Sequence, residues 1–396
     1  MIFPVQKMKT VASLVTVKGE PKQALSVGLE NISSWTGQFV TTETSFETEG
    51  VNFEPGDLLF GKLRPYLAKS WVATSAGSAV GDFHVLRAGK SMLPEFLNRV
   101  LLTPESIRWI DSTTFGSKMP RVSWEDLRSL EIPVPTLEEQ RAIADFLDRE
   151  TAEIDAFIAD QERLIELLTE RRTATITHAV TKGLDPSAPM RDSGIPWLGH
   201  IPAHWHLSAV KYLCNSGNGY AFPSSELVNQ GRLRVVRQSD FFNEDQEIFS
   251  DVYVSNDFII NDGDLLIAMS GSRGFNVISW VGGKAALNQR CAWLRSNEES
   301  EQIFLQYALK QPLRRLHDLS QNTTIPNLSL AELLEQKVAV PPLQEQRAIV
   351  RVLETELGVI DELISDTKRA IELSKERRAA LISAAVTGQM DVRTQT

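Results

Sequence analysis

The sequence predicts an α+β protein in which two globular domains are joined by two long antiparallel coiled-coil helices, forming a pseudo-twofold internal repeat. Three observations lead to this prediction. Residues 132–185 and 338–391 align without a gap at an offset of 206 residues, with 27 identities in 54 positions. Each copy has the apolar spacing of a long helix. The regions that precede the two copies share short motifs in the same order.

Each repeated segment is expected to form one helix of roughly 40 residues. The copies begin VPTLEEQRAIADFLDRE at Val134 and VPPLQEQRAIVRVLETE at Val340. A proline ends the extended segment before each helix, and Thr136 offers an N-cap in the first copy. Apolar residues at steps of three and four predict the interface between the two helices. These residues are Ile143, Leu147, Ile154, Phe157, Leu164 and Leu168 in the first copy, and Ile349, Leu353, Ile360 and Leu363 in the second.

An alternative interpretation of the repeat is a duplicated helical hairpin that only fills a core. Polar residues argue against it, because Glu150, Glu356, Gln161 and Thr367 interrupt the apolar seam. Two equivalent units in one chain tend to pair about a pseudo-twofold axis, and such an axis perpendicular to the helices makes them antiparallel. The globular domains are then expected at opposite ends of the helix pair.

The region that precedes the first long helix has the short alternating runs of an α+β globule. Strands are expected near residues 11–17, 39–42, 58–60, 71–73 and 83–86, and a helix near 94–102. The second globule repeats two motifs of the first: the Gly-Asp-Leu-Leu at Gly56 returns at Gly263, and the Met-Pro-Arg-Val-Ser at Met119 returns as Ile-Pro-Asn-Leu-Ser at Ile325. The two globules are therefore expected to share a fold. The predicted segments are domain 1 at 1–131, helix 1 at 132–185, domain 2 at 186–337, helix 2 at 338–391 and a tail at 392–396.

Composition indicates a multidomain cytoplasmic protein without a membrane segment. The 396 residues are 42% hydrophobic and 23% charged, and they contain neither a signal pattern nor an apolar run of about 18 residues. Cys214 and Cys291 are isolated, which is unlike a disulfide framework or a thiolate metal site. The net charge of −10 argues against a nucleic-acid partner, but the repeated segments hold −8 of it, so the globular regions are nearly neutral.

The sequence contains none of the catalytic motifs that would make this chain an enzyme. Gly89-Lys90-Ser91 and Gly282-Gly283-Lys284 lack the upstream glycine of a P-loop, and GxGxxG, HExxH and GxSxG are absent. His200, His204 and His206 have a spacing that zinc ligands can have, but no cysteine lies nearby, so no metal site is predicted. A degenerate metal-dependent nuclease site remains as the least favoured alternative.

Polar loops with glycine and basic residues beside the expected strands are the candidate DNA contacts. Arginine can pair with guanine, and asparagine or glutamine with adenine, while lysine and serine more often hold phosphate. The candidates in the first globule are Lys62, Arg64, Tyr66, Lys118 and Arg121. Those in the second are Arg232, Arg234, Arg237, Gln238, Ser272, Arg273, Gln289, Arg290, Asn322 and Thr323. Alternation along a strand should put Arg232 and Arg234 on one face, with Arg237 on the other or past the strand end.

Several segments resemble the specificity subunit of Type I restriction-modification systems, and the resemblance covers essentially the full chain. It rests on the repeated VPTLEEQRAIADFLDRE and ERRTATITHAVTKGLD segments and on DSGIPWLGHIPAHW from Asp192 to Trp205. The first globule lacks the WLGxIPxHW segment and starts near the equivalent of Leu207.

The resemblance implies a non-catalytic subunit in which each globule is a target recognition domain that reads one half of a split DNA sequence. It also implies that the helix pair spaces the two halves and docks two methyltransferase subunits, possibly with restriction subunits. No cofactor is expected in this chain, and S-adenosylmethionine, ATP and Mg are expected on the partners. The main alternative is a coiled-coil scaffold that never contacts DNA.

The repeated Glu-Arg-Arg at Glu170 and Glu376 is a further basic feature of the helices. Neither Arg171 nor Arg172 has a carboxylate three or four residues away on its own helix, and the same holds for Arg377 and Arg378. Their ion-pair partners are therefore expected on the opposite acidic helix or on a partner subunit rather than on DNA.

Overall fold

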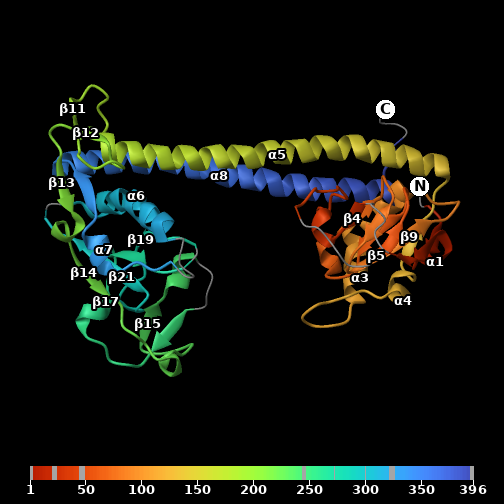
Figure 1. Cartoon of the computed structure of the whole chain (residues 1–396), viewed down its shortest axis with the longest axis horizontal. Coiled ribbons are helices and arrows are strands. Elements are labelled where there is room, and N and C mark those ends of the chain that lie inside the picture. The colour runs from red at the N-terminus through yellow and green to blue at the C-terminus, as the bar shows by residue number, and fades with distance from the viewer. Residues whose placement is uncertain are drawn as a thin grey trace. The chain divides into compact units, whose positions relative to one another are not determined.

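The computed structural model describes residues 3–19, 25–43, 50–242, 247–271, 273–298, 300–320 and 326–392. The chain divides into two compact units, Met1–Leu164 with Asp366–Thr396, and Ile165–Ser365. Each unit contains one half of α5 (Leu137–Lys182) and one half of α8 (Leu343–Val386), the two long helices labelled in Figure 1. The domain boundaries predicted from the sequence stay a prediction.

The first unit has two four-stranded sheets, a strand pair and short helices. One sheet has the order β2 (Ala12–Val15), β9 (Phe83–Ala88), β6 (Leu58–Gly61) and β7 (Ser70–Val72). The other has the order β3 (Lys18–Gly19), β5 (Gly50–Phe53), β8 (Gly77–Ala79) and β4 (Leu25–Val27). β1 (Val5–Lys7) pairs with β10 (Glu131–Pro133). The helices are α1 (Met8–Val11), α2 (Pro94–Leu101), α3 (Pro104–Ser112) and α4 (Trp124–Leu127).

The second unit has the same kind of elements. Its first sheet has the order β14 (Cys214–Asn218), β21 (Cys291–Ser296), β18 (Leu265–Ala268) and β19 (Val277–Ser279). Its second sheet has the order β16 (Ile248–Ser250), β15 (Leu233–Val236), β20 (Ala285–Leu287) and β17 (Ile259–Ile260). β13 (His206–Ala209) pairs with β22 (Lys337–Val340), and β11 (Met190–Asp192) with β12 (His200–Pro202). α6 (Gln302–Ser320) and α7 (Leu330–Leu334) complete the unit.

The two units share a topology, which confirms the prediction drawn from the echoed motifs. In the first sheet of each unit, the first strand (β2 or β14) pairs with the last strand (β9 or β21). The last strand also pairs with the strand that follows Gly-Asp (β6 or β18), which in turn pairs with β7 or β19. All of these pairings are antiparallel. In each second sheet, β8 or β20 pairs antiparallel with β5 or β17 and parallel with β4 or β15. The fourth strand differs, because β3 extends one side of this core and β16 the other.

The repeated Gly-Asp motif makes the same turn in both units. Gly56 and Gly263 have φ of 87° and 89°, the left-handed region that glycine adopts without a steric penalty. Both carboxylate oxygens of the buried Asp57 accept hydrogen bonds from Arg87 at 2.7 Å. Asp264 and Arg295 form the same bidentate pair in the second unit. The motif is therefore structural.

Most of the predicted strands of the first unit are present, but one prediction is wrong. Residues 39–42 form no strand, because only Phe39 bridges to Ile32. The Asn31 amide instead donates to the Val40 carbonyl and the Thr42 hydroxyl, which holds this segment against the loop. The strand predicted at 11–17 is shorter, since α1 takes up its first residue.

α5 begins with the predicted cap, and α8 begins differently. The Thr136 hydroxyl accepts from the Glu139 amide, and the Glu139 carboxylate accepts from the Thr136 amide, which is a capping box. Pro342 stands at the position equivalent to Thr136 and has no amide hydrogen to donate. The carboxylate of Glu345 is therefore available, and it accepts from the Trp205 indole at 3.1 Å and contacts His204 Nε2 at 2.8 Å.

A buried glutamine joins each long helix to a helix of its globule. Gln140 accepts from the Leu93 amide, at the start of α2, and donates to the Ser91 and Pro135 carbonyls. Gln346, 206 residues later, accepts from the Glu301 amide before α6 and donates to the Pro341 carbonyl. Both side chains are fully buried, so their hydrogen bonds explain why the repeated Glu-Gln-Arg motif has this residue.

The long helices are antiparallel within each unit. In the first unit, Arg378 of α8 donates to both carboxylate oxygens of Asp155 of α5. In the second unit, Arg172 of α5 donates to both oxygens of Asp361 of α8. Asp361 and Arg378 lie 206 residues after Asp155 and Arg172, so the two ion pairs are equivalent in the repeat, as a pseudo-twofold axis requires. The ion-pair partners predicted on the opposite helix are thereby confirmed for Arg172 and Arg378.

Seven of the ten predicted seam residues are buried, and three are wrong as seam positions. Phe157, Leu164 and Leu363 are 45%, 39% and 48% exposed. The seam follows a strict heptad that runs 154, 158, 161, 165, 168 in α5, and Ile158 and Ile165 are partly buried on it. Gln161 is a seam position. Because Gln161 is polar, the apolar spacing read from the sequence falls on Phe157 and Leu164. Each of these lies one residue before a seam position, Ile158 or Ile165.

The paired arginines differ in burial, which leads to a prediction about stability. The Arg378 side chain is 9% exposed and that of Arg172 is 33% exposed. Removing one partner of a buried ion pair leaves an uncompensated charge, whereas an exposed pair contributes little. Arg378→Ala is expected to lower the free energy of unfolding by about 3 kcal/mol, and the equivalent Arg172→Ala by less than about 1 kcal/mol. Urea denaturation of the full chain measures both, and equal losses would contradict this explanation.

Among the described residues, no helix combines the length and the hydrophobicity that a membrane span requires.

Candidate nucleic-acid interface

The structure brings together the two basic loops of the first unit that the sequence predicts. The loop after β6 carries Lys62, Arg64 and Tyr66, and a later loop carries Lys118 and Arg121. The Arg64 amide donates to the Pro120 carbonyl at 2.7 Å, and the Val122 amide donates to the Lys62 carbonyl at 3.0 Å. All five predicted side chains of this unit therefore belong to one pair of joined loops.

The second unit joins the equivalent loops with the same hydrogen bonds. The Gly271 amide donates to the Pro326 carbonyl at 3.0 Å, and the Leu328 amide donates to the Met269 carbonyl at 2.8 Å. A β-bridge between Ser270 and Asn327 matches the bridge between Leu63 and Arg121 in the first unit. The backbone of the candidate site is thus duplicated, while its side chains differ.

An acidic side chain organises the cations of the first site. Asp82 accepts from Arg121 at 2.9 Å and lies 3.7 Å from the Lys62 amino group. The hydrogen bond to Asp82 raises the pKa of Arg121. Arg64, Tyr66 and Lys118 are exposed, and Arg64 has a left-handed φ of 50° before Pro65. Sequence reasoning missed Asp82, since a lone aspartate after a strand carries no motif.

The second site has arginine at the place of Asp82. The Met269 amide donates to the Arg290 carbonyl at 3.1 Å, as the Lys62 amide donates to the Asp82 carbonyl at 2.8 Å. Arg290, Gln289 and Arg273 are exposed. The Gln238 amide is bonded to Ser270, accepting from its hydroxyl at 2.9 Å and donating to its carbonyl. Gln238 is therefore held beside the joined loops.

The arginines in and beside β15 differ in the residues that they contact. Arg237 lies past the end of the strand, one of the two places expected from the sequence, and Arg232 lies just before its first residue. Arg234 forms an ion pair with Glu247 at 2.8 Å and stacks on Trp280, 5.1 Å from its ring centroid. Arg232 is exposed and lies over Tyr253. Ser272, Asn322 and Thr323 lie outside the described residues.

One of the three candidate histidines of the second unit has a structural partner among the described residues. His204 contacts Glu345, and the described residues contain no group of three or more histidine, cysteine or acidic side chains that could hold a metal ion. Burial raises the pKa of the Cys214 and Cys291 thiols to about 12, so neither is a reactive thiolate at neutral pH.

Comparisons with known proteins identify the family. A model described as "Type I restriction modification DNA specificity domain" matches residues 75–167 and 202–373. The MjaVIII specificity subunit of Methanocaldococcus jannaschii is 24% identical over 299 residues, 72% of this chain and 68% of that protein. The StySPI specificity subunit of Salmonella potsdam is 23% identical over 435 residues, 98% of this chain and 88% of that protein.

Solved structures show the same fold. A chain from "Structural basis underlying complex assembly and conformational transition of the type I R-M system" has a TM-score of 0.76 at 18% identity, covering 98% of both chains. The HsdS subunit of Thermoanaerobacter tengcongensis has a TM-score of 0.51 at 19% identity, covering 98% of this chain and 97% of that one. With the family model matching more than half of its residues, this chain belongs to the specificity subunits of type I restriction-modification systems.

Proposed function

We propose that each unit reads one half of a bipartite double-stranded DNA target through its joined loops. As a specificity subunit, the chain recognises DNA within a restriction-modification complex, is itself non-catalytic and carries no cofactor of its own. This role rules out the alternative of a scaffold that never contacts DNA. The observation that carries the proposal is the duplicated pair of loops with unlike side chains, because two copies of one frame can present two different sets of base contacts.

The two sites favour different bases in this proposal. Arg290 presents donors that fit guanine O6 and N7, whereas Asp82, at the equivalent place, presents acceptors. The other exposed cations, such as Lys118, are suited to phosphate. The halves of the target are therefore expected to differ in sequence.

The long helices have two proposed roles. They fix the spacing between the half-sites, and they dock two methyltransferase subunits, with restriction subunits joining the assembly. The apolar side chains of Phe157, Leu164 and Leu363, which the seam leaves exposed, support a partner surface on the helices. S-adenosylmethionine, ATP and Mg belong to these partners in the proposal, and the assembly acts in the cytoplasm.

Binding of target DNA tests the proposal. Three of the candidate cations, Lys62, Arg121 and Arg234, pair with internal carboxylates, so the purified chain is expected to bind duplex DNA weakly. Addition of the methyltransferase subunits is expected to raise the affinity at least a hundredfold. Electrophoretic mobility shift at low salt measures both, with a duplex altered in one half-site as the control. Strong binding by the isolated chain that the partner leaves unchanged would contradict the prediction.

A further inference from the structure

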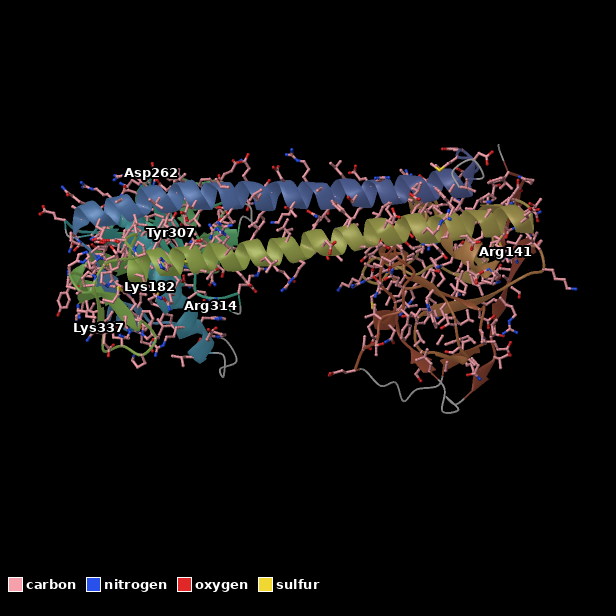
Figure 2. The ribbon with its side chains drawn as sticks, turned by 90° about the horizontal axis from the view of Figure 1, so that it is seen from above. Arg141, Lys182, Asp262, Tyr307, Arg314 and Lys337 are labelled. Atoms are coloured by element: carbon pink, nitrogen blue, oxygen red, sulfur yellow. The ribbon has the colours of Figure 1, made fainter. Side chains whose placement is uncertain are left out.

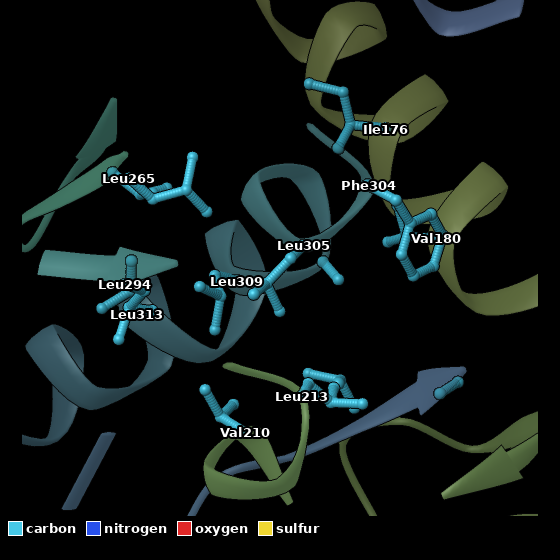
Figure 3. Close-up of a cluster of buried hydrophobic side chains, with 14 of the residues drawn as sticks. Ile176, Val180, Val210, Leu213, Leu265, Leu294, Phe304, Leu305, Leu309 and Leu313 are labelled. Atoms are coloured by element: carbon cyan, nitrogen blue, oxygen red, sulfur yellow. The ribbon is translucent and has the colours of Figure 1, made fainter. Parts of the chain in front are cut away.

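A basic cleft of about 650 Å³ lies in the second unit, between the C-terminal half of α5 and α6. Its floor is apolar, because Ile176 and Val180 of α5 and Leu313 of α6 belong to the core cluster shown in Figure 3. Its wall is cationic: Arg172, Lys310, Arg314 and Arg315 line it, against one lining carboxylate, Asp318. A volume of this size suits a ligand as large as a nucleotide.

Three of these four cations lack an ion pair in the described part of the chain, and the fourth, Arg172, is bonded to Asp361. Among the described residues, no carboxylate forms an ion pair with Lys310, Arg314 or Arg315. Lys310 lies over the ring of Tyr307, which Figure 2 labels together with Arg314, and Arg315 lies over Trp197. Burial and the neighbouring Arg172 lower the pKa of Lys310 to about 8. Asp361 offsets part of this effect, and a further anion bound in the cleft would favour the charged form of Lys310.

The first unit supplies its own anion at the equivalent place. Thr177 lines the cleft of the second unit, and its equivalent in the repeat is Ser383. The Ser383 hydroxyl donates to the carboxylate of Glu105, on α3, at 3.0 Å. The equivalent of Arg172, Arg378, is buried and bonded to Asp155 and to the Trp35 carbonyl. The open basic cleft is therefore not a requirement of the shared fold.

We propose that the cleft between α5 and α6 binds a multiply charged phosphate group through Lys310, Arg314 and Arg315. Three uncompensated cations exceed what a single carboxylate neutralises, and guanidinium groups match phosphate oxygens in pairs. Gln311, whose buried side-chain oxygen has no hydrogen-bond partner, lines the same cleft and can accept from a hydroxyl or amino group of the ligand. The site is separate from the joined loops that read DNA in the proposed function.

Titration of the full chain with inorganic tripolyphosphate, followed by isothermal calorimetry at low salt, tests the proposal. Saturable one-to-one binding is expected. Lys310→Met and the more exposed Arg314→Gln are each expected to weaken it at least tenfold. Arg351→Gln removes an exposed charge of α8 outside the cleft and is expected to change the affinity less than twofold. Thr177→Glu, which supplies an internal carboxylate as the first unit does, is expected to abolish binding.

The source of the phosphate is distinguished by competition. If duplex DNA without the target sequence displaces tripolyphosphate, and this displacement is lost in Lys310→Met, the ligand of the cleft is the DNA backbone. Failure of DNA to displace it assigns the cleft to a free phosphate compound, and both results support the phosphate site. The proposal is overturned by an absence of saturable binding, by equal effects of Lys310→Met and Arg351→Gln, or by tighter binding of a polyglutamate peptide than of tripolyphosphate.

Discussion

Replacing Lys62, Arg64, Arg232 and Arg273 together with alanine is expected to reduce target methylation about a thousandfold while the complex still assembles. Four DNA contacts at about 1 kcal/mol each lose about 4 kcal/mol, and each 1.4 kcal/mol is roughly a tenfold change in affinity. Arg64, Arg232 and Arg273 are exposed, and Lys62 is held toward the joined loops by Asp82. Methylation rates of the reconstituted complex on target DNA measure the effect.

The matched control removes the same charge elsewhere. Lys9, Lys90, Lys337 and Arg351 are exposed and lie outside the joined loops. Their combined replacement with alanine is expected to change methylation less than about fivefold, through the long-range field alone. Assembly of both variants is measured by gel filtration with the methyltransferase subunits. Equal loss in the two variants would mean that net charge, rather than the loops, governs DNA binding.

Lengthening both long helices is expected to lengthen the gap in the DNA target. One heptad inserted after Asp160 and one after Asp366, which are equivalent positions, preserve the seam. Seven helical residues add about 10 Å, and successive base pairs are about 3.4 Å apart. A gap longer by about 3 base pairs is therefore expected, with both half-sites unchanged. Sequencing of methylated sites in a host that carries the altered chain reads the gap directly.

A variant of unchanged length is the control for this insertion. Replacing exposed polar residues of the same stretches, such as Glu162 and Lys368, with alanine leaves the helix length and the seam as they are. The gap of this variant should equal that of the parent chain. An unaltered gap in the lengthened chain would show that the helices do not set the spacing.

The duplication made most of the fold predictable, because residues at equivalent positions of the two copies are expected to have the same structural role. The repeated Gly-Asp-Leu-Leu predicted that the two units share a fold. The structure adds that this motif forms a turn and that the repeated glutamines anchor the long helices. The phase of the helix seam was harder, since Gln161 breaks the apolar pattern and the exposed Leu164 continues it one residue out of step. Polar seam residues make local periodicity ambiguous.

The candidate site was predictable as a set of loops but not as an arrangement of charges. Glycine and basic residues marked both loops, and the structure joins them. The sequence could not show that Asp82 holds Lys62 and Arg121, or that Glu247 holds Arg234, because these pairs join residues from separate segments. Ion pairs of this kind decide which cations are available to DNA, and only tertiary contacts reveal them.

Exchange of one unit's globule tests the central claim most directly. The residues of the first predicted domain, 1–131, are replaced by the corresponding segment of a relative with a different target, and the methylated sites of the host are sequenced. One half of the recognised sequence is expected to change to that of the relative, while the other half and the gap stay as they were. A change in both halves, or in neither, would contradict independent reading of the two half-sites by the two units.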